Sequence, residues 1–163
     1  MPPADPAGTE GRLLKLSLIG TFLTSIAVAG ATADRRLARL GALDLTKLGL
    51  ASHRIGRMIA FERVAQPIRE PFTATVPDET GADETVVARG RGVQWALGEL
   101  MSCPTCVATW AALALYLGRA VLPGPTRVLV NVLAIAGVAE VAYVGVERLE
   151  WAARAARRAS AGD

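Results

Sequence analysis

Three long apolar runs constrain this chain more than any other feature of its sequence. Residues 16–33 and 100–118 contain no charged side chain, and residues 128–146 contain only Glu140. Each run is 18 or 19 residues long, and an α-helix of about 20 apolar residues crosses a hydrocarbon core of roughly 30 Å. The sequence therefore predicts an all-α integral membrane protein with three transmembrane helices.

The composition supports this class. Of the 163 residues, 52% are hydrophobic and 20% are charged, and the charges lie almost entirely outside the three runs. That distribution excludes a soluble enzyme, a secreted disulfide framework and an intrinsically disordered chain. The net charge of +3 does not indicate nucleic-acid binding, because the cations form no basic block with interleaved aromatic residues.

A different kind of helix is predicted at residues 43–66. Apolar residues recur there every three or four positions, while Lys47, Arg54 and Arg57 fall on the opposite face. A full crossing is disfavoured, because each cation at mid-membrane costs about 2.5–3.5 kcal/mol and all three would have to be offset. We therefore expect an amphipathic helix in the lipid interface. The candidate contacts with lipid or a partner are Arg54, Arg57, Arg63 and Arg69.

The rest of the chain divides around these helices. Pro67 and Pro71 should end the amphipathic helix. The expected segments are a disordered tail (1–12), a first transmembrane helix (13–33), the amphipathic helix (43–66), a cytoplasmic loop (73–92), a second transmembrane helix (97–122), a third (126–147) and a charged tail that continues the helix (148–163).

The first apolar run has a rival interpretation as a signal peptide. Ala31-Thr32-Ala33 fits the small-residue pattern of a cleavage site. Three cations follow at once, at positions 35, 36 and 39, and cations there resist export. We therefore expect an anchor that is retained.

The cations also predict the orientation. The middle segment and the C-terminal tail hold 14 of the 18 Lys and Arg residues, which places both in the cytoplasm of a bacterial cell by the positive-inside rule. The protein is thus expected in the cytoplasmic membrane. If residues 43–61 cross the bilayer instead, the N-terminus moves inside, but the last two spans and Cys103 keep their orientation.

The most specific local motif is Cys103-Pro104-Thr105-Cys106. Proline favours the first position of a helix, and the partial positive charge at a helix N-terminus favours thiolates. Two thiols at this spacing support either dithiol redox chemistry or half of a metal site, such as zinc; simple packing is the remaining reading. On the cytoplasmic side we expect both thiols to be reduced.

A metal site would need further ligands. The candidates are Glu140, which should lie at a depth similar to Cys106, His53, and the same cysteine pair from a second chain. The plainer readings are that Glu140 is protonated or pairs with an arginine of the amphipathic helix, and that His53 is solvated. Trp110 should pack against neighbouring helices.

Two strings of this sequence, residues 48–72 and 97–110, together resemble the domain of unknown function 1360 family of small bacterial membrane proteins. The resemblance covers roughly residues 43–147, and the first apolar run looks like an addition. The family usually has Asp where Glu62 stands and often an aromatic residue where Thr105 stands. The resemblance implies a fold and a location but no reaction. Its signature positions correspond here to Arg54, Arg57, Arg69, Glu99, Cys103, Pro104, Cys106 and Trp110.

Three functions are compatible with these features. The sequence favours a non-catalytic accessory, assembly or anchoring subunit, in contact with the bilayer and part of a homo-oligomer or membrane complex, whose CxxC is a clip. The first alternative is a membrane thiol–disulfide oxidoreductase that uses Cys103 and Cys106. A weaker alternative is a pore former of the holin type, for which only Glu140 offers a polar lining.

Overall fold

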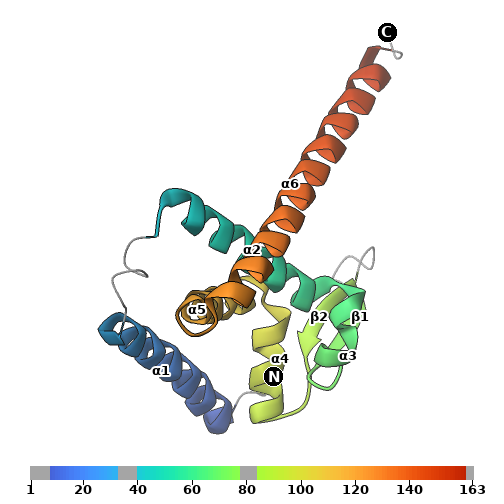
Figure 1. The fold of residues 1–163 in the computed structure, drawn as a ribbon. Coiled ribbons are helices and arrows are strands. Elements are labelled where there is room, and N and C mark those ends of the chain that lie inside the picture. The colour runs from blue at the N-terminus through green and yellow to red at the C-terminus, as the bar shows by residue number, and fades with distance from the viewer. Residues whose placement is uncertain (1–7, 33–39, 78–83, 161–163) are drawn as a thin grey trace.

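The computed structural model describes residues 8–32, 40–77 and 84–160, and most of them are helical (Figure 1). By length and apolar composition, α1 and α6 are each able to cross a membrane, and α4 with α5 makes a third candidate if that bent pair counts as one span. The elements in order are α1 (Gly8–Thr32), α2 (Ala42–Phe61), the short 3-10 helix η1 (Arg63–Ala65), α3 (Gln66–Arg69), β1 (Thr73–Pro77), β2 (Glu84–Ala88), α4 (Val93–Ser102), α5 (Pro104–Val121) and α6 (Pro123–Ser160).

The prediction of an all-α fold is wrong in one respect, because the expected loop at 73–92 contains a small sheet. β1 and β2 pair antiparallel, from Thr73 opposite Ala88 to Pro77 opposite Glu84. The hairpin packs on α4 at Gly98, where a Cβ would lie 2.2 Å from the carbonyl oxygen of Phe72. The β-branched residues of both strands explain the pairing.

The second apolar run is not one straight helix. α4 and α5 meet at an angle of 91°, with Cys103 between them. Pro104 causes this break, because it disfavours the helical conformation at the residue before it, and Cys103 is extended at φ −101° and ψ 102°. The predicted helix start at this motif is present, but residues 97–122 do not form one continuous helix.

Other boundaries differ from those expected. α1 begins at Gly8, so part of the predicted tail is helical, and α2 ends at Phe61 rather than near residue 66. α6 begins at Pro123, three residues before the expected third span, which leaves only Leu122 between α5 and α6. Residues 1–7 and the cations at 35, 36 and 39 lie outside the described residues.

The helix contacts show the direction in which each helix runs. Asp44 of α2 pairs with Arg119 of α5 at 3.1 Å, and Gly56 of α2 approaches Pro104 at the other end of α5. α2 and α5 are therefore antiparallel, and they pack along most of their length. Leu48, Ala51, Leu115 and Val130 form a buried cluster between α2, α5 and α6.

α1 runs in the same direction as α5. The Phe22 ring packs edge-on against Trp110 with 5.1 Å between centroids, and further along both helices Ala29 of α1 lines one cavity with Tyr116 of α5. The predicted three-span topology requires the first and second spans to run in opposite directions. The observed direction therefore fits the alternative in which residues 43–61 cross as well.

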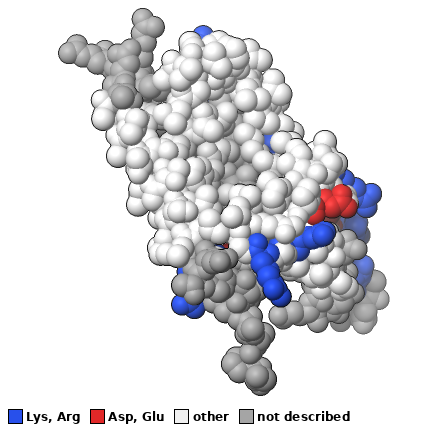
Figure 2. Space-filling model, turned by 90° about the horizontal axis from the view of Figure 1, so that it is seen from below, with Lys and Arg blue, Asp and Glu red and all other residues white. Residues whose placement is uncertain are grey.

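The surface is consistent with a membrane environment. Figure 2 shows a broad face with few charged side chains, and most of the charges visible in that view gather near one end. Large apolar side chains are exposed along α1 and α6, among them Leu16, Leu23 and Ile135. From residue 141 to 158 every position of α6 is exposed, and this half of the helix projects beyond the rest of the molecule (Figure 1).

Candidate redox site and adjoining charge cluster

The two cysteines lie at the break between α4 and α5. Their sulfur atoms are at disulfide distance, their Cα atoms are 5.2 Å apart, and the structure joins them. The sulfur of Cys103 also accepts a hydrogen bond from the backbone N–H of Cys106 at 3.2 Å, so it caps the first turn of α5. Cys106 is exposed and Cys103 is half-buried. The two sulfurs are thus placed to form a disulfide, and the reduced state of the pair in the cell stays a prediction.

A glycine of α2 supports this turn from behind. A Cβ at Gly56 would lie 2.3 Å from the carbonyl oxygen of Pro104 and 2.9 Å from the Cβ of Ala108. Only a residue without a side chain lets α2 approach the CPTC turn so closely. Gly56 is therefore part of the framework of the site.

We expect Gly56→Ala to displace the turn and to lower the free energy of unfolding by about 1–3 kcal/mol, the usual cost of overpacking. Thermal unfolding of the detergent-solubilised protein measures the loss. Gly49→Ala is the matched control, because it lies in the same helix with nothing within 4 Å of its Cβ position. Equal midpoints for the two variants would contradict the close approach.

An apolar cavity of about 420 Å³ opens beside the cysteines, between α1, α4 and α5. Its wall includes Cys106, Trp110, Phe22 and Leu100, and we call it the Cys106 cavity. The size falls within the range of small-molecule sites, about 300–1,000 Å³. Cys106, an exposed residue, therefore borders a space large enough for a ligand.

Three polar side chains also line this cavity. Lys15 pairs with Glu99, and its ammonium lies 4.4 Å from the centroid of the Trp95 ring. Thr109 donates its hydroxyl hydrogen to the carbonyl of Thr105 at 2.8 Å. The first two groups come from different helices and hold α1 against α4.

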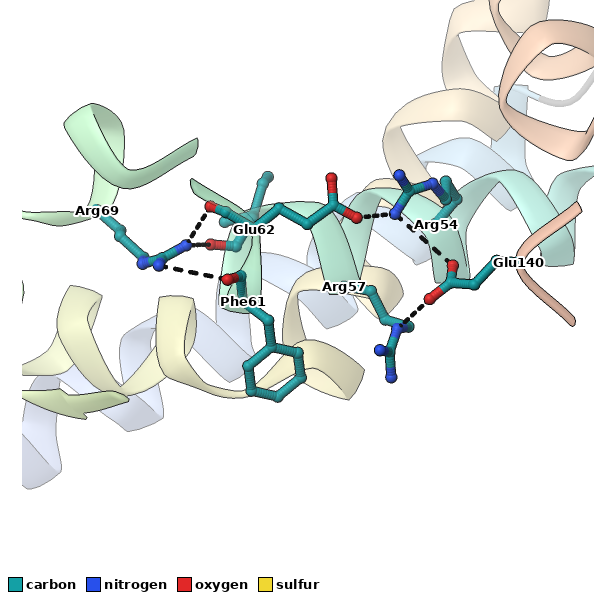
Figure 3. A network of polar contacts seen from close by, with 7 residues as sticks. Arg54, Arg57, Phe61, Glu62, Arg69 and Glu140 are labelled. Carbon is teal, nitrogen blue, oxygen red and sulfur yellow. Dashed lines mark hydrogen bonds and ion pairs between the residues drawn. The ribbon is translucent and has the colours of Figure 1, made fainter. Parts of the chain in front are cut away.

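A cluster of charged residues joins α2 to α6 (Figure 3). Arg57 Nε lies 2.5 Å from Glu140 Oε1, and Arg54 pairs with Glu62 and lies 3.6 Å from Glu140 Oε2. That second carboxylate oxygen is buried and has no hydrogen-bond donor in the described part of the chain.

Arg69 closes the C-terminal end of α2. The side chain is 6% exposed and donates to the carbonyl of Glu62 at 2.7 Å, of Ile59 at 3.3 Å and of Phe61 at 3.5 Å (Figure 3). The carbonyls of Ile59 and Phe61 belong to the last turn of α2, where carbonyls lack partners within the helix, and that of Glu62 also accepts from the backbone N–H of Ala65. Arg69 therefore stabilises the end of α2 at Phe61. The sequence predicts that Pro67 and Pro71 end this helix, but both lie further along the chain.

The structure does not bring the proposed metal ligands together. Glu140 points to Arg54 and Arg57, and His53 is exposed on α2. Within residues 8–32, 40–77 and 84–160, no group of three or more His, Cys, Asp or Glu side chains is placed to hold a metal ion. Arg63 is exposed in η1.

Sequence reasoning missed three residues that build these sites: Gly56, Lys15 and Glu62. Gly56 carries a readable signal, since a small residue within a helix of a membrane protein often marks close helix approach. The partners of Lys15 and Glu62 depend on tertiary packing that no local pattern contains.

Comparison with known proteins gives a family model and two relatives that match this chain. The model of the "Protein of unknown function (DUF1360)" family matches residues 47–146, which include the CPTC turn, α2 after its first turn and Glu140. The chain is 37% identical over 103 residues to the sporulation protein YjcA of Bacillus subtilis (strain 168), covering 61% of this chain and 87% of YjcA. It is 33% identical over 102 residues to the UPF0713 protein YngL of the same organism, covering 61% of this chain and 75% of YngL.

No solved structure matches the chain. The matched region contains Arg54, Glu62, Glu140 and both cysteines, whereas α1 lies outside it. Since the family model covers more than half of the sequence, the chain belongs to the DUF1360 family.

Proposed function

We propose that this protein is a membrane thiol–disulfide exchange protein whose reactive pair is Cys103 and Cys106. The observation that carries the proposal is the position of Cys106: it is exposed at a helix N-terminus, at disulfide distance from Cys103, and borders a cavity. A structural disulfide is usually buried and inert, whereas exposed pairs are the labile ones. This geometry favours exchange over the clip of a non-catalytic accessory subunit.

The step is an ordinary thiol–disulfide exchange. A thiolate of an external dithiol attacks one sulfur of the Cys103–Cys106 bond and forms a mixed disulfide, and the other cysteine leaves as a thiolate. The second external thiol then resolves the mixed disulfide, which leaves both cysteines reduced and the external pair oxidised. Cys106 is the sulfur open to attack, and the N-terminus of α5 stabilises the negative charge on Cys103 through the backbone N–H of Cys106.

Glutathione exchange with the purified full-length protein tests this proposal. We expect the pair to be reduced and reoxidised reversibly without unfolding, because one sulfur is exposed. In the single variants, the thiol that remains in Cys103→Ser should form a mixed disulfide with oxidised glutathione about tenfold faster than the thiol in Cys106→Ser. Maleimide mass shifts measure both reactions.

The accessory-subunit function predicts the opposite behaviour. A clip would exchange only when the protein unfolds, and its removal in the double variant Cys103→Ser, Cys106→Ser would lower the thermal midpoint and break any oligomer. A pair that stays inert to glutathione in the folded protein would refute thiol exchange as the function.

We also propose that α2 crosses the bilayer as a fourth span. Its charges discourage a crossing when they are counted singly, but Arg57 and Arg54 face Glu140 and Glu62, and Asp44 faces Arg119. The antiparallel packing of α2 on α5 and the shared direction of α1 and α5 support the same topology. The cation distribution then places the N-terminus, the β-hairpin and the end of α6 in the cytoplasm.

Labelling of single cysteines tests this topology. In a background without the native pair, we expect Gly41→Cys to react with an impermeant maleimide in intact cells, while Glu70→Cys and Ser160→Cys react only after lysis. Gly41 and Glu70 are exposed at opposite ends of α2. If Gly41→Cys also needs lysis, α2 lies in the cytoplasmic interface instead. Labelling of Ser160→Cys in intact cells would reverse the orientation.

A further inference from the structure

We infer that the Cys106 cavity binds a membrane-soluble quinone, which accepts the electrons of the cysteine pair. This inference rests on the proposed thiol exchange and adds the second reactant. It follows from one juxtaposition: the exposed Cys106 lies in the wall of an apolar cavity that two aromatic rings and a Lys–Glu ion pair also line.

The cavity suits a quinone ring in shape and chemistry. Its wall contains the rings of Phe22 and Trp110, which offer stacking surfaces to a flat ligand. Lys15 lies at the same wall and supplies N–H donors for a carbonyl oxygen, while Glu99 balances its charge. A ligand pocket with a mostly apolar lining and a few placed polar groups is the usual form of such sites.

A second cavity suits the chain that a membrane quinone carries. It measures about 550 Å³ and lies between α1, α2 and α5, and it shares Phe22 and Thr109 with the Cys106 cavity. Its remaining wall is largely apolar and includes Ile26, Leu48 and Leu113. The two adjoining cavities therefore provide a place for a polar ring next to Cys106 and a place for a hydrocarbon tail along α1.

The electron transfer balances with these two reactants alone. The two thiols lose two electrons and two protons as the bond between Cys103 and Cys106 forms. The quinone gains both electrons and two protons and becomes the quinol. Lys15 is the positioning residue for the ring, because its ammonium can donate a hydrogen bond to the oxygen on which negative charge develops.

The test uses the reduced full-length protein in detergent without oxygen. The probe is a benzoquinone with a ten-carbon tail and a fully substituted ring, so that thiols do not add to the ring. We expect one quinol, measured by ultraviolet absorbance, for each pair of thiols lost. Ile19→Trp should slow this reaction about tenfold or more by filling the cavity, because Ile19 is in its wall.

Two comparisons make the test specific. Leu23→Trp is the matched control, since Leu23 is an exposed residue of the same helix that does not line the cavity, and it should react like the unaltered protein. Glutathione exchange should be unchanged in Leu23→Trp, and it is measured in Ile19→Trp as well, so that a loss confined to the quinone reaction is separated from a loss of both reactions. Should Ile19→Trp fail to fold, Leu18→Trp fills the same cavity.

Each result decides a different statement. The inference is supported if quinol forms and if Ile19→Trp slows its formation while Leu23→Trp does not. Three results would overturn the quinone site and leave thiol exchange standing. They are equal rates of quinol formation in both tryptophan variants, no quinol from a pair that still exchanges with glutathione, and a tightly bound phospholipid that blocks the quinone. A pair inert to glutathione as well as to quinone would remove the proposed function too.

Discussion

Arg69→Met should unfold at a midpoint on the order of 10 °C below that of the unaltered protein. The change removes the donor to three main-chain carbonyls at the end of α2: that of Glu62 keeps the backbone N–H of Ala65 as a donor, whereas those of Ile59 and Phe61 lose the guanidinium. Unsatisfied buried groups and lost charged hydrogen bonds cost about 3 kcal/mol together, and a chain of this length loses about 2–4 °C per kcal/mol. Thermal unfolding in detergent measures the difference.

The control for this experiment lies six residues earlier. Arg63→Met also removes one positive charge, but Arg63 is exposed, so its midpoint should change little. Arg69→Lys should fall between the two, because one ammonium cannot reach three carbonyls as the guanidinium fork does. If both Met variants lose the same stability, net charge rather than the closing of α2 explains the effect.

Glu140→Leu should lower the free energy of unfolding by about 2 kcal/mol. The replacement leaves Arg57 without its carboxylate partner on α6. Breaking a fully buried pair typically costs about 3–5 kcal/mol, and we expect less here because the side chain of Arg57 is 45% exposed. Chemical denaturation of the purified protein gives the value.

A double replacement distinguishes the loss of the Glu140–Arg57 ion pair from other effects of changing Glu140. Glu140→Leu combined with Arg57→Leu should recover stability, because neither charge is then left alone. Glu147→Leu provides the matched control, since Glu147 is an exposed carboxylate further along α6. A loss from Glu147→Leu as large as that from Glu140→Leu would show that the pair with Arg57 is not the cause.

The sequence predicts helices well where one local property decides them. The three apolar runs predict α1, α5 and α6, and Pro104 predicts a helix start at the CPTC motif. The same proline also bends the chain by 91°, but its sequence signal cannot give the angle, which depends on the packing of Gly56 and Gly98 against backbone carbonyls.

The charged residues of α2 show where sequence reasoning fails. From the sequence, each cation of α2 adds its own free-energy cost for entering the membrane. In the structure, Arg57 and Arg54 lie close to Glu140 of α6, a helix far along the chain. Such pairs appear only once the fold brings α2 and α6 together. The hairpin differs from the predicted loop for another reason. Thr and Val in 73–77 and 84–88 favour strands, but the turn-forming residues between them make the whole segment resemble a loop.

The long C-terminal half of α6 gives the molecule a mechanical property. About 30 Å of helix extends past Glu140, from residue 141 to residue 160. After Gly145 this segment contains neither Gly nor Pro, so it has no site at which helices usually kink. We expect this segment to move as a rigid rod that begins next to Glu140, the residue whose carboxylate pairs with Arg57. A sideways force at the tip would therefore tilt the whole arm and strain that ion pair instead of bending the helix.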